Sequence, residues 1–185
     1  MWPAHPPGEA ETCQTHEQKG VYGGYAPGSL ATDDDVGETP RTDPRAMILL
    51  DTNVLLYAFD LNSPFCQWAR ETIADAVAGD GAAITAVSLA ELCVGDAEPS
   101  TVADRIRSWG VEILDVPVAA ADVCATAYLQ YRKRRMSQSD IPVPTMPLPD
   151  FFIGAHAKIM GWELATADRG RFHTYFPSVS LKMPQ

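Results

Sequence analysis

Four acidic residues stand where an apolar, strand-like run gives way to a new segment. Asp51 ends the run MILLD, and Glu91 lies in VSLAELC, which follows the short run AAIT. Asp150 opens DFFIGAHAKIM, and Asp168 follows ELAT by two residues. Carboxylate oxygens without Cys or His suit Mg²⁺ or Mn²⁺, and such ions promote attack of water on a phosphodiester. The pattern therefore indicates metal-dependent hydrolysis of a phosphodiester.

Electrostatics favours a shared cation if these acids lie close together. Two carboxylates about 4 Å apart repel each other by about 4 kcal/mol at an effective dielectric of about 20. Three or four such groups would hold protons or destabilise the fold unless a cation lay among them. We therefore interpret the four acids as one candidate metal site.

Each acid also has a purely structural interpretation. Asp51 and Asp150 suit a helix N-cap, a role worth about 1 kcal/mol. Ser88-x-x-Glu91 fits a capping box, in which the glutamate bonds back to the start of the helix. Asp168 suits a turn. These roles account for each residue singly, but they give no reason for four acids to share one edge of the fold.

Three neighbours of the acids fit the same hypothesis. Asn53, two residues after the first acid, needs a hydrogen-bond partner if it is buried, and the adjacent carboxylate is a natural one. Thr166, two residues before the last acid, projects to the same face if that segment is a strand. Gly154, one helical turn after Asp150, either leaves room for a ligand or allows close helix packing.

Short apolar runs alternate with longer segments bounded by Pro and Gly, as strands alternate with helices. The predicted strands are 46–50, 82–85, 111–116, 163–166 and 178–182. The predicted helices are 64–79, 87–95, 99–110, 119–136 and 150–160, with a Pro-rich loop at 137–149. This order predicts a three-layer α/β/α fold with a central, mainly parallel β-sheet. Sites in such sheets lie beyond the carboxyl ends of the strands, where the acids are expected.

The composition separates an N-terminal tail from the folded part. Residues 1–46 contain six Gly and six Pro and no periodic apolar pattern, so we predict a disordered tail, with Met47 as the natural start. Residues 47–185 form the predicted domain. No apolar run approaches the length of a membrane span, and the four Cys have no CxxC spacing. We expect a soluble, cytoplasmic protein with reduced thiols. The net charge of −10 argues against nonspecific coating of nucleic acid.

The ordered set of acidic segments resembles the PIN domain family of metal-dependent nucleases. MILLDTNVLLYAFD resembles the family's opening strand and first acid, TAVSLAEL the second, PLPDFFIGAHA the third, and LATADRGRF the fourth with its preceding Thr. The resemblance runs from Met47 to about Leu181. It implies a PIN-like fold and a catalytic cluster made of Asp51, Glu91, Asp150 and Asp168.

The resemblance also implies ligands and partners. Asp51 and Asp150 would bind one or two Mg²⁺ or Mn²⁺ ions, and Asn53 and Thr166 would orient the acids. Many small single-domain members are VapC-type toxins of type II toxin–antitoxin pairs, endoribonucleases inhibited by an antitoxin encoded beside them. The implied partners are an RNA substrate, a cognate antitoxin protein and a second copy in a homodimer.

Two basic segments are candidates for contacts with the substrate. Arg169 and Arg171 flank the fourth acid, where they either bind RNA or form a salt-bridged turn. The cluster YRKRR at 131–135 is either a solvated helix end, whose cations complement the helix dipole, or a patch that contacts phosphate.

Two other functions compete with a nuclease. The first is a non-catalytic PIN-fold module for binding or assembly, against which the intact set of four acids speaks. The second is a phosphatase of the haloacid dehalogenase type, which also begins with an Asp at a strand end. That chemistry requires a second Asp where this chain has Asn53.

Overall fold

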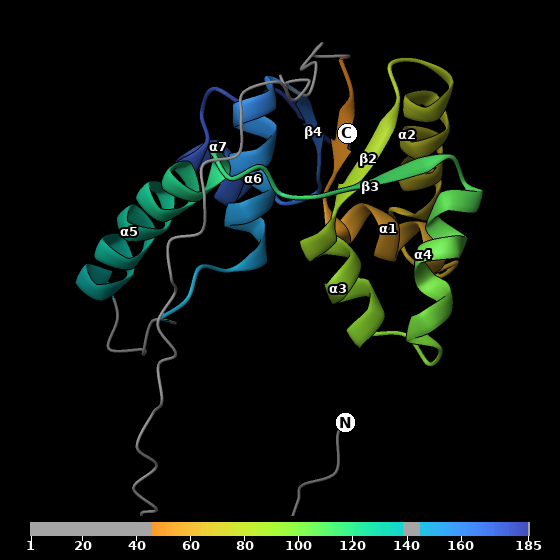
Figure 1. Ribbon diagram of the computed structural model, residues 1–185, viewed down its shortest axis with the longest axis horizontal. Helices are drawn as coiled ribbons and strands as arrows, with labels where there is room; N and C mark the ends of the chain where they lie inside the picture. The colour runs from red at the N-terminus through yellow and green to blue at the C-terminus, as the bar shows by residue number, and fades with distance from the viewer. Residues whose placement is uncertain (1–45, 139–144, 185) are drawn as a thin grey trace, which may run out of the picture. The chain divides into compact units, whose positions relative to one another are not determined.

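A five-stranded, entirely parallel β-sheet forms the centre of the fold (Figure 1). Its spatial order is β3-β2-β1-β4-β5. The strands are β1 (Ile48–Leu50), β2 (Ala82–Thr85), β3 (Val111–Leu114), β4 (Glu163–Ala165) and β5 (Leu181–Lys182). The first two strands are fully buried, as expected for strands covered on both faces.

The computed structural model describes residues 46–138 and 145–184. The predicted disordered tail 1–46 therefore lies outside the described residues, apart from Ala46. The predicted Pro-rich loop 137–149 lies partly outside them. Among the helices of the described ranges, none combines the length and apolar character needed to cross a membrane.

Helices cover both faces of the sheet, because neighbouring residues of a strand point to opposite sides. Ile48 and Leu50 of β1 pack into one apolar core with α1, α2, α3 and α4, whereas Leu49 packs into a second core with α5, α6 and α7 (Figure 1). The helices are α1 (Thr52–Phe59), α2 (Cys66–Ala78), α3 (Ala86–Val94), α4 (Pro99–Ser108), α5 (Ala120–Gln138), α6 (Pro149–Met160) and α7 (Arg169–Tyr175). The predicted three-layer α/β/α fold is confirmed.

Two helices of the structure, α1 and α7, were not predicted from the sequence. In α1 the sequence TNVLLYAF is apolar almost throughout, so it lacks the amphipathic period that identifies a helix. In α7 the seven residues RGRFHTY bury only Phe172. Each of these two helices begins directly after one of the four candidate acids.

The strand order reverses direction at the centre of the sheet. From β1 the chain moves outward to β2 and β3, then crosses back to place β4 on the other side of β1. In parallel sheets, ligands bind beyond the carboxyl ends of the strands at such a switch point. The carboxyl ends of β1 and β4 are therefore the expected place for a site.

Candidate active site

Asp51 lies at the carboxyl end of β1, directly beside β4. Leu50 pairs with Ala165 across the two strands, and the backbone N–H of Asp51 donates to the carbonyl of Ala165 at 2.9 Å. This register brings Thr166, the next residue of the chain, against Asp51. Two segments more than a hundred residues apart thus meet at the switch point of the sheet.

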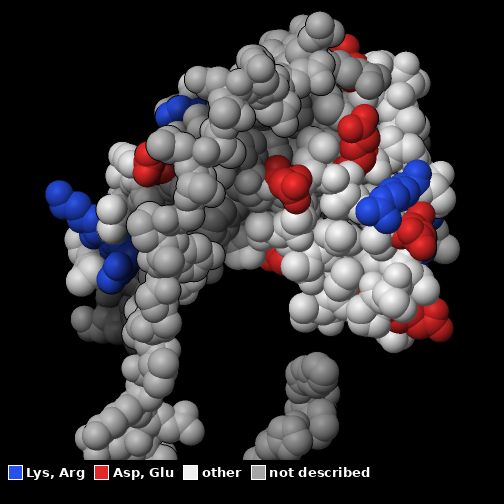
Figure 2. Space-filling model, viewed as in Figure 1, with Lys and Arg blue, Asp and Glu red and all other residues white. Residues whose placement is uncertain are grey.

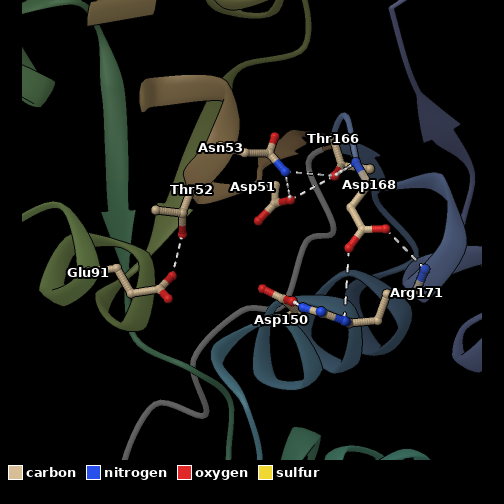
Figure 3. Close-up of polar contacts among 8 residues, drawn as sticks. All are labelled: Asp51, Thr52, Asn53, Glu91, Asp150, Thr166, Asp168 and Arg171. Atoms are coloured by element: carbon tan, nitrogen blue, oxygen red, sulfur yellow. Dashed lines mark hydrogen bonds and ion pairs between the residues drawn. The ribbon is translucent and has the colours of Figure 1, made fainter. Parts of the chain in front are cut away.

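The carboxylate of Asp51 is held by two side chains. The amide Nδ2 of Asn53 donates to Asp51 Oδ2 at 2.5 Å, and the Thr166 hydroxyl donates to the same oxygen at 2.7 Å (Figure 3). The amide oxygen of Asn53 in turn accepts the backbone N–H of Ala167 at 3.2 Å. Asn53 and Thr166 were expected to orient the acids, and both contact the first of them.

Asp51 is a buried acid whose charge is only partly compensated. It occupies the N-cap position of α1, but its side chain makes no capping bond. Only 3% of the residue is exposed, and burial raises the pKa of Asp51 to about 6. Hydrogen bonds from Thr166 and from the Thr52 backbone oppose this rise in pKa, while the nearby charges of Glu91 and Asp168 add to it. Within the described residues, no Lys or Arg forms an ion pair with Asp51.

Glu91 does not take part in a capping box. Helix α3 begins at Ala86, and its N-cap is Thr85, whose hydroxyl oxygen accepts the backbone N–H of Ser88 at 3.0 Å. The capping-box interpretation is therefore wrong, because Glu91 lies in the middle of the helix. Its Oε2 instead accepts a hydrogen bond of 2.6 Å from the hydroxyl of Thr52. Glu91 is thereby fixed to the residue that follows Asp51.

Asp150 and Asp168 lie at the starts of two different helices, and the side chain of Arg171 lies near both of them. The N-cap of α6 is Leu148, so Asp150 lies in the first turn of α6 and is not its cap. Asp168 is the N-cap of α7, and its Oδ1 accepts the backbone N–H of Arg171 at 3.2 Å. The guanidinium of Arg171 forms an ion pair with Asp150 and lies 3.9 Å from an oxygen of Asp168 (Figure 3).

The two flanking arginines thus lie in different surroundings. Arg171, which the sequence suggested as a substrate contact, bridges two of the acids. Arg169 is exposed, and among the described residues it forms no ion pair with any acid. The spacing in the sequence was consistent with the contact of Arg171, because residues three apart on a helix, such as Asp168 and Arg171, are neighbours on its surface.

Close packing of the helices requires a glycine at position 154. A Cβ atom at this position would lie 2.5 Å from two ring carbons of Phe176. Of the two interpretations that the sequence left open, close packing accounts for this glycine. The glycine lets α6 lie against Phe176, the residue that follows α7, and so it positions Asp150 indirectly.

The donor chemistry of the cluster fits a hard divalent cation. Figure 3 shows the carboxylates of Asp51, Glu91, Asp150 and Asp168 turned toward a common space, and the rise in the Asp51 pKa is partly due to two of these neighbours. All the donors are oxygens, as Mg²⁺ and Mn²⁺ prefer. As they stand, however, no three His, Cys, Asp or Glu of the described residues are arranged to hold one ion.

Arg171 lies among these acids. Its Nη1 contacts Oδ2 of Asp150, and its Nε lies 3.9 Å from Oδ2 of Asp168. The contact of Thr52 with Glu91 and the role of Arg171 were both missed from the sequence. Thr52 stands inside the quoted segment DTN, but nothing in the spacing linked it to Glu91, 39 positions away.

Comparisons with known proteins agree on the architecture. The family model of the PIN domain matches residues 48–176. No curated protein sequence matches the chain. Among solved structures, VapBC-1 from nontypeable Haemophilus influenzae has a TM-score of 0.53 at 17% identity, over 74% of this chain and 97% of that one.

Two further solved structures are similar. DNA-bound VapBC from Salmonella typhimurium has a TM-score of 0.52 at 17% identity, over 75% of this chain and 98% of that one. A toxin–antitoxin complex from Klebsiella pneumoniae has a TM-score of 0.50 at 22% identity, over the same shares. At these identities, the structural likeness shows a common fold.

Proposed function

The chain belongs to the PIN domain family, and from this membership and its acidic cluster we propose that it is a Mg²⁺- or Mn²⁺-dependent endoribonuclease. The observation that carries the proposal is the state of Asp51. This carboxylate is buried, its pKa is raised by burial and by two neighbouring acids, and no described cation pairs with it. Carboxylates with a strongly raised pKa cluster at functional sites, and a bound cation would compensate the charge of this one.

The residues of the site have separate tasks in this proposal. Asp51 and Asp150 would bind the ion, and Asn53 and Thr166 hold Asp51 so that one of its oxygens keeps a fixed position. When bound, the ion supplies an activated water and stabilises the oxygen that leaves phosphorus. Hydrolysis forms one P–O bond to water and breaks one P–O bond of the RNA backbone.

Glu91 and Asp168 serve as proton acceptors in this scheme. Both carboxylates act electrostatically on Asp51, so both lie near this proposed metal ligand. Thr52 fixes Glu91, and the start of α7 fixes Asp168. The two carboxylates together take up the proton that the attacking water loses, so loss of one impairs this step, and the leaving oxygen gains a proton from solvent.

The proposed physiological role is the toxin of a type II toxin–antitoxin pair. One of the structurally similar proteins was solved as a toxin–antitoxin complex, which supports an antitoxin as the partner of this chain. Homodimer formation and a cytoplasmic location belong to the same proposal. A small DNA-binding protein encoded by the neighbouring gene would support it, since such pairs are encoded together.

The test is cleavage of structured RNA by the purified protein with Mg²⁺. Activity should disappear with EDTA and with Asp51→Asn. The matched control is Asp104→Asn, since Asp104 is exposed on α4 and, among the described residues, its carboxylate pairs only with Arg107. A control that is as inactive as Asp51→Asn, or cleavage that persists in EDTA, contradicts the proposal.

The arrangement around Arg171 supports one alternative. A non-catalytic PIN-fold module for binding or assembly would keep the ion pair of Arg171 with Asp150 and bind no metal. Calorimetric titration with Mn²⁺ separates the two functions. Absence of both metal binding and RNA cleavage favours the module, whereas binding that Asp51→Asn abolishes favours the nuclease.

A further inference from the structure

A pocket of about 310 Å³ lies beside the acidic cluster, between the C-terminal part of α5 and α7. Its wall includes Arg134 and Arg135 from α5 and Arg171 from α7, together with Asp168. We call this feature the basic pocket. It shares two residues, Asp168 and Arg171, with the candidate active site, so the two are continuous.

The basic pocket concentrates positive charge in a chain of formal net charge −10. Figure 2 shows Lys and Arg side chains gathered over the C-terminal end of α5. Among the described residues, neither Arg134 nor Arg135 forms an ion pair, and the buried Nε of Arg135 has no hydrogen-bond partner. Within the described residues these two guanidinium groups thus have no acidic partner, and Arg134 is exposed.

Aromatic rings line the same pocket. Tyr131 and Tyr175 pack edge to face with ring centroids 5.8 Å apart, and the guanidinium carbon of Arg135 lies 5.9 Å from the centroid of Tyr131. Both rings are half-buried. Arginine next to aromatic rings is a combination that proteins use to hold the backbone and bases of single-stranded nucleic acid. A solvated helix end, the other interpretation of YRKRR, requires neither the tyrosines nor a hollow.

We propose that the basic pocket binds the phosphodiester backbone of single-stranded RNA on one side of the bond to be cut. This inference rests on the proposed function and extends it, because it assigns the path of the substrate. Arg134 and Arg135 each contact a phosphate, and Tyr131 and Tyr175 form the floor of the path. The strand then passes Arg171 and reaches the acidic cluster.

Arg171 connects the pocket with the acids. Its guanidinium pairs with Asp150 and also faces the basic pocket. A phosphate group bound there competes with Asp150 for the same N–H donors, since guanidinium binds phosphate and carboxylate in the same forked geometry. Entry of RNA into the pocket thus releases the Asp150 carboxylate, which belongs to the proposed metal site.

The test compares two double variants that remove the same charge. Arg134→Gln/Arg135→Gln alters the basic pocket, and Arg105→Gln/Arg107→Gln alters the far helix α4. Fluorescence anisotropy measures binding of a labelled single-stranded oligoribonucleotide in EDTA at several salt concentrations. Loss of two phosphate contacts should reduce the magnitude of the negative slope of log K against log salt by about 1.4 in the first variant alone. Its affinity at low salt should fall about tenfold.

The single variant Arg134→Gln controls for misfolding of the double variant. Arg134 is exposed, so Arg134→Gln leaves the packing of α5 intact and should reduce the magnitude of the salt slope by about 0.7. Equal affinity and slope in the pocket and α4 variants overturn the inference, as does an absence of RNA binding by the unaltered protein. RNA cleavage is measured separately with Mg²⁺. Cleavage that persists with unchanged binding in the pocket variants rejects the pocket and leaves the proposed nuclease intact.

Discussion

The guanidinium of Arg171 forms an ion pair with the carboxylate of Asp150, joining the start of α7 to the first turn of α6. A cation of the chain itself thus contacts an acid that is proposed to bind metal. Arg171→Gln should therefore raise the affinity for Mn²⁺ about tenfold, because removing one competing guanidinium contact of about 1.4 kcal/mol frees Asp150.

Isothermal titration calorimetry measures this change without any need for catalysis. Arg107→Gln is the matched control, since within the described part of the chain Arg107 pairs only with the exposed Asp104. Equal Mn²⁺ affinity in Arg171→Gln and in the control would show that the ion pair does not compete with metal.

The buried Asp51 predicts an unusual pH dependence for the metal-free protein. Its pKa is about 6 in the folded chain and 3.8 when unperturbed, so the folded state binds the proton more tightly. The resulting stability is fully present below pH 3.8 and is lost as pH rises through about 6. The loss amounts to about 3 kcal/mol by pH 7.

Urea unfolding in EDTA between pH 4 and 7 tests this expectation. Asp51→Asn should remove the decline and be more stable than the unaltered chain at pH 7. Burial lowers the pKa of His156, but that histidine is present in both proteins, so its contribution cancels in the difference. Parallel curves for the two proteins would contradict the assigned pKa of Asp51.

Glu91 should matter for activity and little for stability. Helix α3 is capped by Thr85, and Glu91→Gln keeps an oxygen that accepts the hydroxyl of Thr52. We expect RNA cleavage to fall at least about a hundredfold, as for loss of a proton acceptor, while the unfolding free energy changes by less than about 1 kcal/mol.

Thr85→Ala is the companion variant, because it removes the cap itself. It should lower the unfolding free energy by about 1 kcal/mol. If Glu91→Gln destabilises the chain as much as Thr85→Ala and leaves cleavage intact, Glu91 has a structural role only.

Gly154→Ala should destabilise the domain by about 1–3 kcal/mol, because the added Cβ would overlap the ring of Phe176. Gly170→Ala is the matched control in α7, where the nearest atom to the new Cβ, an oxygen of Asp168, is 3.7 Å away. Urea titration of both variants measures the difference. A Gly154→Ala variant as stable as Gly170→Ala would mean that α6 shifts away from Phe176 without loss of packing.

The sequence was sufficient to predict the sheet and the neighbourhood of Asp51. Asp51 and Thr166 each follow a short apolar run, and parallel strands bring such positions to one edge. The contact of Thr52 with Glu91 could not be predicted from the sequence, because it depends on how α3 packs against the start of α1. The role of Arg171 depended on α7, a helix too short to show a period in the sequence.

The bond between Asp51 and Thr166 spans 115 positions of the chain. During synthesis, a growing polypeptide has produced its first acid long before the hydroxyl that orients it. Because β4 pairs directly with β1, the centre of the sheet remains open until this late strand arrives. Any product truncated ahead of Thr166 lacks the last acid as well, so whatever chemistry the site performs is withheld until β4 and the start of α7 have been made.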